Sequence, residues 1–229
     1  RPDLAMSLNN LATMLSAVGQ REPALEAAQE AVELYRDLSA ANPAAFRSNF
    51  AASLNTLALR LNEVGQLEQA LEAAQEAVSI RRDLCAANPA AFRPNLAASL
   101  NTLANRLSNV GQREQALEAA QEAADLHRDL SASNPAAFRQ NLAKSLNNLA
   151  NALGDVGRRE QALEAAQEAV DLYRNLSSAN PAAFRPNLAI SLNNLGNRLS
   201  EVGQHEQALK AAQEAADLYR DLSAANSDA

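Results

Sequence analysis

Residues 93–138 read RPNLAASLNTLANRLSNVGQREQALEAAQEAADLHRDLSASNPAAF, and this 46-residue pattern recurs along the whole 229-residue chain. A glycine marks the same place in every copy, at Gly19, Gly65, Gly111, Gly157 and Gly203. A period of this length is typical of stacked supersecondary units, because a single unit cannot bury its own apolar face. We therefore expect one solenoid domain over 1–229, divided into repeats 1–46, 47–92, 93–138, 139–184 and 185–229.

Each repeat is predicted to fold as two helices. In the third, Leu96, Leu100 and Leu107 lie on one helical face that ends at Gly111, where glycine can adopt the left-handed conformation that closes a helix. A second helix is expected from about 114 to 133. It ends at Asn134, because the residue before a proline is disfavoured in the helical region. Residues 136–140 are then expected to turn the chain back toward the next repeat.

Alanine columns indicate where the helices pack closely. We expect one column to lie in the tight contact between the two helices of each repeat, namely Ala28, Ala74, Ala120, Ala166 and Ala212. Small side chains allow helix axes to approach at the short end of the usual spacing of about 8–10 Å. Stacking of such hairpins predicts an all-α solenoid.

Composition excludes several function classes. The net charge of −7 disfavours nucleic acid and anionic membranes as partners, because both require a basic face. A single cysteine excludes an internal disulfide and a cysteine-based zinc site. No apolar run is long enough to cross a bilayer, and we expect a cytoplasmic protein. The chain begins at Arg1 rather than at methionine, so we expect it to be part of a longer protein.

The fifth repeat resembles the tetratricopeptide repeat (TPR). The residues that carry the resemblance are Asn194-Leu195-Gly196-Asn197, Leu199, Gly203, Ala208-Leu209 and Ala215. The period departs from the usual 34 residues, and arginine stands where the family has its closing proline, at Arg36, Arg82, Arg128, Arg174 and Arg220. Both departures are similar to the long-period TPRs of kinesin light chains, and related arrays occur in bacterial signalling proteins. The resemblance implies a right-handed superhelical solenoid of five antiparallel helix-turn-helix repeats.

The resemblance also implies a binding surface for a protein or extended peptide. In TPR proteins the first helix of each repeat lines the concave face. Carried onto this chain, that face holds rows of polar side chains, mostly amides, which offer both donors and acceptors to a peptide backbone. The candidate binding residues are Asn9, Asn10, Asn55, Thr56, Asn101, Thr102, Asn105, Lys144, Asn147, Asn148, Asn151, Asn193, Asn194 and Asn197.

An alternative interpretation assigns the asparagines to the framework. The column that contains Asn147 is asparagine in all five repeats, whereas residues that select a ligand should differ between repeats. These amides would then hydrogen-bond one another or nearby backbone. The neighbouring column differs in each repeat except for two alanines, and holds Met6, Ala52, Ala98, Lys144 and Ile190. Lys144 would select one acidic group on an otherwise neutral or basic peptide.

Nothing in the pattern indicates catalysis by this chain. His127, His205 and Cys85 each replace a different residue type in a repeated column, which is typical of drift at structural positions. No phosphate-binding loop or metal-ligand spacing occurs, and no cofactor is implied. The leading hypothesis is a non-catalytic binding scaffold in a larger signalling protein. Two alternatives remain: a structural array that self-associates end to end, and the regulatory part of an enzyme whose catalytic domain lies outside this chain.

Overall fold

The structure is a computed structural model that describes residues 1–227. Within that range the chain forms ten α-helices and no β-strand, two helices to each repeat, which confirms the all-α prediction. No helix of these residues has the length and apolarity needed to span a bilayer. The helices are α1 (Pro2–Ala17), α2 (Arg21–Ala41), α3 (Pro43–Glu63), α4 (Leu67–Ala87), α5 (Pro89–Asn109), α6 (Arg113–Ser133), α7 (Pro135–Asp155), α8 (Arg159–Ala179), α9 (Pro181–Glu201) and α10 (His205–Ser227).

The turn inside each repeat is closed by the recurring glycine. All five of these glycines have a positive φ, between 79° and 82°, a conformation that costs other residues energy but suits glycine. After Gly111, the amide of Gln112 donates to the carbonyl of Leu107 at 2.9 Å and satisfies one of the last helical carbonyls. The prediction that glycine ends the first helix of each repeat is therefore confirmed.

The connection between repeats is shorter than the sequence suggested. The prediction of a turn over residues 136–140 is wrong, because these residues already belong to α7. Asn134 alone separates α6 from α7, and its side-chain oxygen accepts a hydrogen bond from the amide of Ala137 at 3.3 Å. Asparagine is a favoured N-cap, and proline is tolerated at the first helical position because its missing N–H would have no helical partner there. The Asn-Pro pair therefore ends one helix and starts the next.

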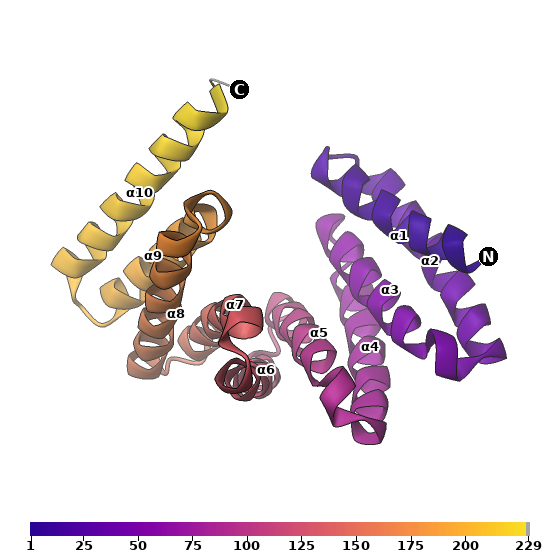
Figure 1. The fold of residues 1–229 in the computed structure, drawn as a ribbon. Coiled ribbons are helices and arrows are strands. Elements are labelled where there is room, and N and C mark those ends of the chain that lie inside the picture. Colours follow the sequence, from indigo (N-terminus) through magenta and orange to yellow (C-terminus); the bar gives the residue numbers. More distant parts are fainter. Residues whose placement is uncertain (228–229) are drawn as a thin grey trace. The chain divides into compact units, whose positions relative to one another are not determined.

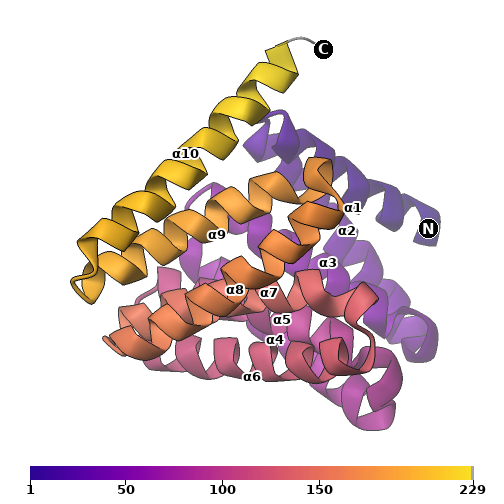
Figure 2. The ribbon, with the colours of Figure 1, turned by 60° about the vertical axis from the view of Figure 1, so that its left-hand side comes forward.

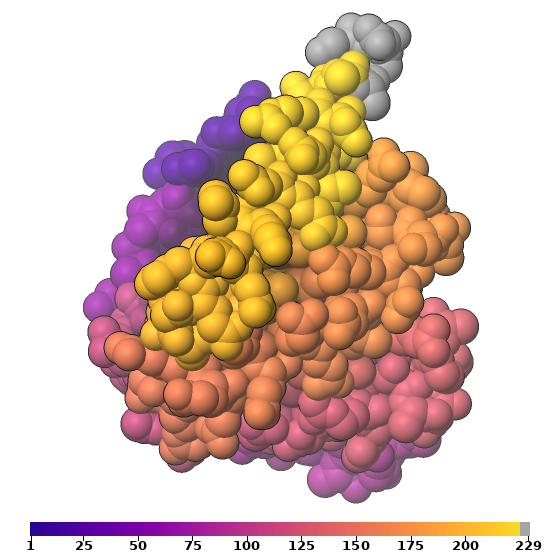
Figure 3. Space-filling model, turned by 90° about the vertical axis from the view of Figure 1, so that its left-hand side faces the viewer, coloured from indigo at the N-terminus to yellow at the C-terminus, as the bar shows by residue number. Residues whose placement is uncertain are grey.

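The chain divides into two compact units, residues 1–119 and 120–229. In the first unit, α2 packs against α1 and α3, and α4 packs against α3 and α5 (Figure 1). In the second, α8 packs against α7 and α9, and α9 lies between α8 and α10 (Figure 2). Figure 3 shows α10, in yellow, exposed on the surface of this unit beside the orange α8 and α9.

The first helices of successive repeats approach one another more closely than the second helices do. The helix α3 contacts α1 and α5, and α7 contacts α9. Among the described residues, the backbones of α2 and α4, and those of α8 and α10, do not approach one another in this way. Each unit, taken by itself, therefore curves toward its first helices. We call the exposed side of these helices (α1, α3 and α5 in one unit, α7 and α9 in the other) the inner surface.

The alanine column that contains Ala28 faces the following repeat. Ala28, Ala74, Ala120 and Ala166 are all 0% exposed, whereas Ala212 in the last repeat is exposed. The neighbouring residues Ala211 and Ala215 stay buried on the same helix, at 7% and 1%. Ala28 also clusters with Ala12 of its paired helix α1. The following repeat therefore adds to the cover of this column, and the column loses that cover where no further repeat follows.

Candidate functional site

The predicted binding residues separate into buried and exposed columns on the inner surface. In the invariant column, Asn101 and Asn147 are buried, Asn9 and Asn55 are half-buried, and Asn193 is exposed. In the second column Asn10 is exposed, and the half-buried members are Thr56, Thr102, Asn148 and Asn194. The side chains that are exposed in the remaining columns are Asn105, Lys144, Asn151 and Asn197.

The invariant asparagines bond to serines of the next repeat. The hydroxyl of Ser53 donates to Oδ1 of Asn9 at 3.1 Å. The side-chain amide of Asn55 donates to the hydroxyl of Ser99 at 2.7 Å. The hydroxyl of Ser191 donates to Oδ1 of Asn147 at 3.0 Å. We call this series the Asn–Ser ladder. It joins α1 to α3, α3 to α5 and α7 to α9, so these amides hold adjacent first helices in register.

The threonines in the second column bond to their own helices. The hydroxyls of Thr56 and Thr102 donate to the carbonyls of Ala52 and Ala98, each at 3.3 Å. These carbonyls lie one helical turn earlier, which is a common partner for a threonine in a helix. The hydroxyl hydrogens of these threonines are therefore already used within their own helices.

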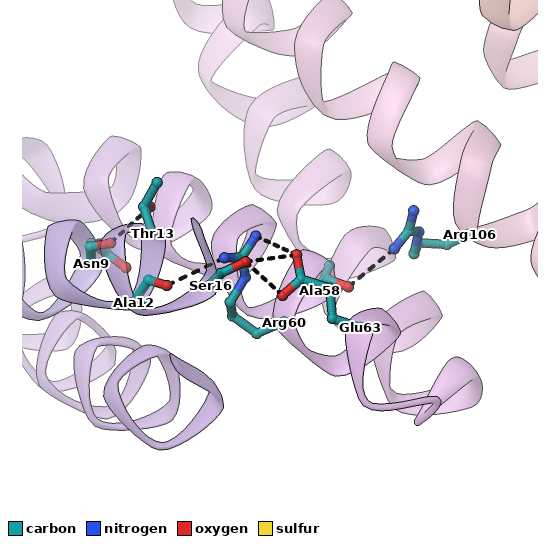
Figure 4. A network of polar contacts seen from close by, with 8 residues as sticks. All are labelled: Asn9, Ala12, Thr13, Ser16, Ala58, Arg60, Glu63 and Arg106. Atoms are coloured by element: carbon teal, nitrogen blue, oxygen red, sulfur yellow. Dashed lines mark hydrogen bonds and ion pairs between the residues drawn. The ribbon is translucent and has the colours of Figure 1, made fainter. Parts of the chain in front are cut away.

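Buried arginines form a second link between first helices (Figure 4). Nη1 of Arg60 donates to the carbonyl of Ala12 at 3.2 Å, and Nη1 of Arg106 donates to the carbonyl of Ala58 at 3.4 Å. Both arginines are only 7% exposed. Burial lowers the pKa of the Arg106 guanidinium, and the nearby Glu63 carboxylate opposes that shift. An arginine keeps its charge at neutral pH in spite of such a shift.

Glu63 completes this network at the edge of the inner surface. Its carboxylate lies 2.9 Å from Nη2 of Arg60 and accepts hydrogen bonds from the hydroxyl of Ser16 at 2.9 and 3.0 Å. The fifth repeat contains the corresponding pair, Arg198 and Glu201, at 3.0 Å. The acidic residues that the sequence places on this edge therefore have partners within the protein.

A buried histidine lies behind Lys144. His127 is 1% exposed, and its Nδ1 lies 2.7 Å from the hydroxyl of Ser145. Burial, followed by the charge of Lys144, lowers the pKa of His127 to about 4. Its other nitrogen, Nε2, has no hydrogen-bond partner in the structure. His127 is therefore neutral at pH 7, and both His127 and Ser145 are buried.

Charged pairs join the second helices on the opposite side of the repeats. Arg36 lies 3.8 Å from Glu76, Arg128 lies 3.0 Å from Glu168, and Arg174 lies 2.7 Å from Glu214. In each pair an arginine of one second helix reaches a glutamate of the next. The glutamates of this column therefore link neighbouring repeats and are not only solvent-exposed charges.

Sequence reasoning overlooked the partners of the Asn–Ser ladder and the buried arginines. A signal was present, because the column of Ser53, Ser99, Ser145 and Ser191 is as invariant as the asparagine column two residues later. The arginine column was harder to identify, since methionine and alanine replace arginine in two of its five positions, Met14 and Ala152. Among residues 1–227 the structure brings together no metal-binding group of three or more His, Cys, Asp or Glu side chains.

Comparisons with known proteins agree with this architecture. Models of the tetratricopeptide repeat match residues 4–42, 50–89, 96–134 and 141–221. The kinesin light chain-like protein of Podosopora anserina, with nearly identical TPR-like repeats, is 19% identical at a TM-score of 0.69, over 97% of this chain and 98% of that one. MamA from Desulfovibrio magneticus RS-1 is 19% identical at a TM-score of 0.57, over 96% of this chain and 97% of that one.

The Rap protein, in complex with competence and sporulation factor, is 14% identical at a TM-score of 0.70, over 93% of this chain and 54% of that one. At such identities the likeness shows the fold alone. The comparison with curated proteins found no similar sequence.

Proposed function

Because the chain belongs to the tetratricopeptide-repeat family, we propose that it is a non-catalytic scaffold whose inner surface binds an extended segment of a partner protein. We further propose that it acts in the cytoplasm, as the recruitment module of a larger signalling protein. The Rap protein, which shares the fold, is described in complex with a factor. The fold by itself does not specify a ligand, so the argument depends on the side chains.

The observation that carries this proposal is the division of the inner surface into buried and exposed asparagines. Asn147 is committed to the Asn–Ser ladder, whereas Asn151 and Asn197 are exposed on the adjacent helices α7 and α9. An exposed amide offers a donor and an acceptor to a peptide backbone. The two exposed amides therefore suit an extended segment that crosses α7 and α9, and specificity comes from the exposed Lys144 and Ile190 beside them.

A peptide array, followed by titration of its best binder, tests this surface. The double variant Asn151→Ala/Asn197→Ala should weaken binding while leaving the melting temperature unchanged. Lys144→Ala should weaken only peptides that carry an acidic residue. The matched control is Asn147→Ala, which should lower the melting temperature because Asn147 belongs to the Asn–Ser ladder. If Asn151→Ala/Asn197→Ala binds every array peptide as the unmodified protein does, the inner surface of this unit is not the binding site.

A second candidate is end-to-end self-association, and exposed apolar residues at the two ends favour it. On α1, Leu4 is 49% exposed although Leu96 in the same column is 6% exposed. On α10, Leu209 is 59% exposed although Leu71 in the same column is 8% exposed. These faces pack against neighbouring repeats elsewhere in the chain. Light scattering should show an average mass that increases with protein concentration, and Leu4→Glu and Leu209→Glu should each abolish this increase. A mass that stays constant with concentration would exclude this candidate.

A further inference from the structure

The second helices of the last two repeats enclose a groove that the inner surface does not share. It lies between α8 and the start of α10, and the end of α9 contributes to its lining. Its volume is about 560 Å³, and its apolar lining consists of Leu163, Leu172 and Leu199. We call this feature the outer groove. Its volume lies within the range of about 300–1,000 Å³ that is common for ligand pockets.

The walls of the outer groove are acidic. Glu164, Glu168 and Asp171 line it, and neither lysine nor arginine is among its lining residues. Glu168 is paired with Arg128 at 3.0 Å. Asp171 lies 4.0 Å from Arg174 and accepts a hydrogen bond from Gln167 at 3.2 Å. For Glu164 the described structure contains no ion pair. One carboxylate thus stands beside an apolar floor without a cationic partner.

We propose that the outer groove binds a short segment of a partner protein in which a leucine-sized side chain lies next to an arginine or lysine. The apolar side chain would fill the space over Leu172 and Leu199, and the cationic group would pair with Glu164. Buried apolar anchors surrounded by polar contacts supply most of the binding energy in protein interfaces. The neutral amides of Gln167 and Gln207, which also line the groove, offer hydrogen bonds to the backbone of such a segment.

The first unit contains a corresponding groove with different properties. It lies between α2 and α4 over α3, and its volume is about 250 Å³. Arg36 is among its lining residues and lies 3.8 Å from Glu76. In the outer groove the equivalent arginine, Arg174, is paired with Glu214 at 2.7 Å and is not among the lining residues. The volume of the groove between α2 and α4 is also smaller. The groove between α2 and α4 therefore serves as a matched control within the same chain.

The probe for this proposal is an array of fluorescein-labelled peptides that carry one Leu-Arg pair in randomised neutral flanks, beside the same peptides with Leu-Gln. The strongest binder is then titrated by fluorescence anisotropy against the full chain. Glu164→Gln should weaken the Leu-Arg peptide about threefold to fivefold, the effect of a partly exposed ion pair, and should leave the Leu-Gln peptide unchanged. Circular dichroism confirms that the variant folds.

Site-specific cross-linking locates the bound peptide. In a Cys85→Ser background, Gln167→Cys carries a benzophenone label inside the outer groove. The control, Gln29→Cys, has the same label at the equivalent position of the first groove. Preferential cross-linking from Gln167→Cys supports the proposal. Equal or stronger cross-linking from Gln29→Cys, an absence of binders, or affinity that depends on Asn151 and Asn197 instead of Glu164 would overturn it.

Discussion

The hydroxyl of Ser191 on α9 donates a hydrogen bond to Oδ1 of Asn147 on α7, with 3.0 Å between the two oxygens. The serine is 0% exposed and the asparagine is 8% exposed, so water cannot replace either partner. A buried polar group that loses its hydrogen bond costs free energy. Duplication of the repeat copies both partners of the bond together.

Ser191→Ala should lower the free energy of unfolding by about 1–3 kcal/mol, because it leaves the buried oxygen of Asn147 without a donor. Urea denaturation monitored by circular dichroism measures this difference. The control is Ser7→Ala, since Ser7 occupies the same column in the first repeat and is exposed. Equal effects of the two substitutions would show that the bond between Ser191 and Asn147 contributes nothing to stability.

Stability should fall as the pH drops from about 6.5 to about 4, because His127 stays neutral in the folded protein. In the unfolded chain this histidine has its ordinary pKa of about 6.5 and gains a proton first, which favours unfolding. The difference between the two pKa values of His127 corresponds to about 3 kcal/mol in the free energy of unfolding. This contribution is fully lost only at a pH below both values. Urea denaturation at a series of pH values across this window measures the loss.

His127→Tyr should remove that part of the pH dependence. Tyrosine occupies the same column in other repeats, where Tyr35 and Tyr173 are 3% and 2% exposed. Tyr173 hydrogen-bonds to the side chain of Asn187, and Asn141 stands at the equivalent position for a tyrosine at 127. Parallel pH profiles for the unmodified protein and the variant would mean that His127 does not control acid stability.

Ala166→Leu should destabilise the fold by about 1–3 kcal/mol, because a fully buried alanine leaves no space for three further carbon atoms. Ala212→Leu, in the same column of the last repeat, should have little effect because that residue is exposed. Thermal denaturation of both variants provides the comparison. The opposite order of melting temperatures would contradict the assignment of this column to the contact with the following repeat.

Cys85→Ser should leave stability nearly unchanged. Cys85 is half-buried, and the same column contains serine in the four other repeats, at Ser39, Ser131, Ser177 and Ser223. Surface and half-buried substitutions that remove no packing or bonding usually stay within about 0.5 kcal/mol. A melting temperature that drops by more than a few degrees would indicate a role for the thiol that the other repeats do not share.

Local chemistry explains why the sequence predicted the helices so well. A glycine such as Gly111 and a pair such as Asn134-Pro135 restrict their own backbone angles, whatever surrounds them. Because the sequence repeats every 46 residues, each of these signals occurs again in successive repeats, which strengthens the prediction. The prediction failed over residues 136–140 because Asn-Pro both ends a helix and caps the next, and the sequence shows the end more plainly than the start.

The period, the helices and the alternation of apolar and polar faces were thus determined by the sequence itself. Only the tertiary structure decided which polar columns are buried and which are exposed. Asn147 and Ser191 are 44 residues apart in the chain, and Arg174 and Glu214 are 40 apart. Helical periodicity places a side chain on a face, but the offset between neighbouring helices selects its partner, and that offset is set by how the repeats pack. The same packing brings Leu172 and Leu199 together beside Glu164 in the outer groove.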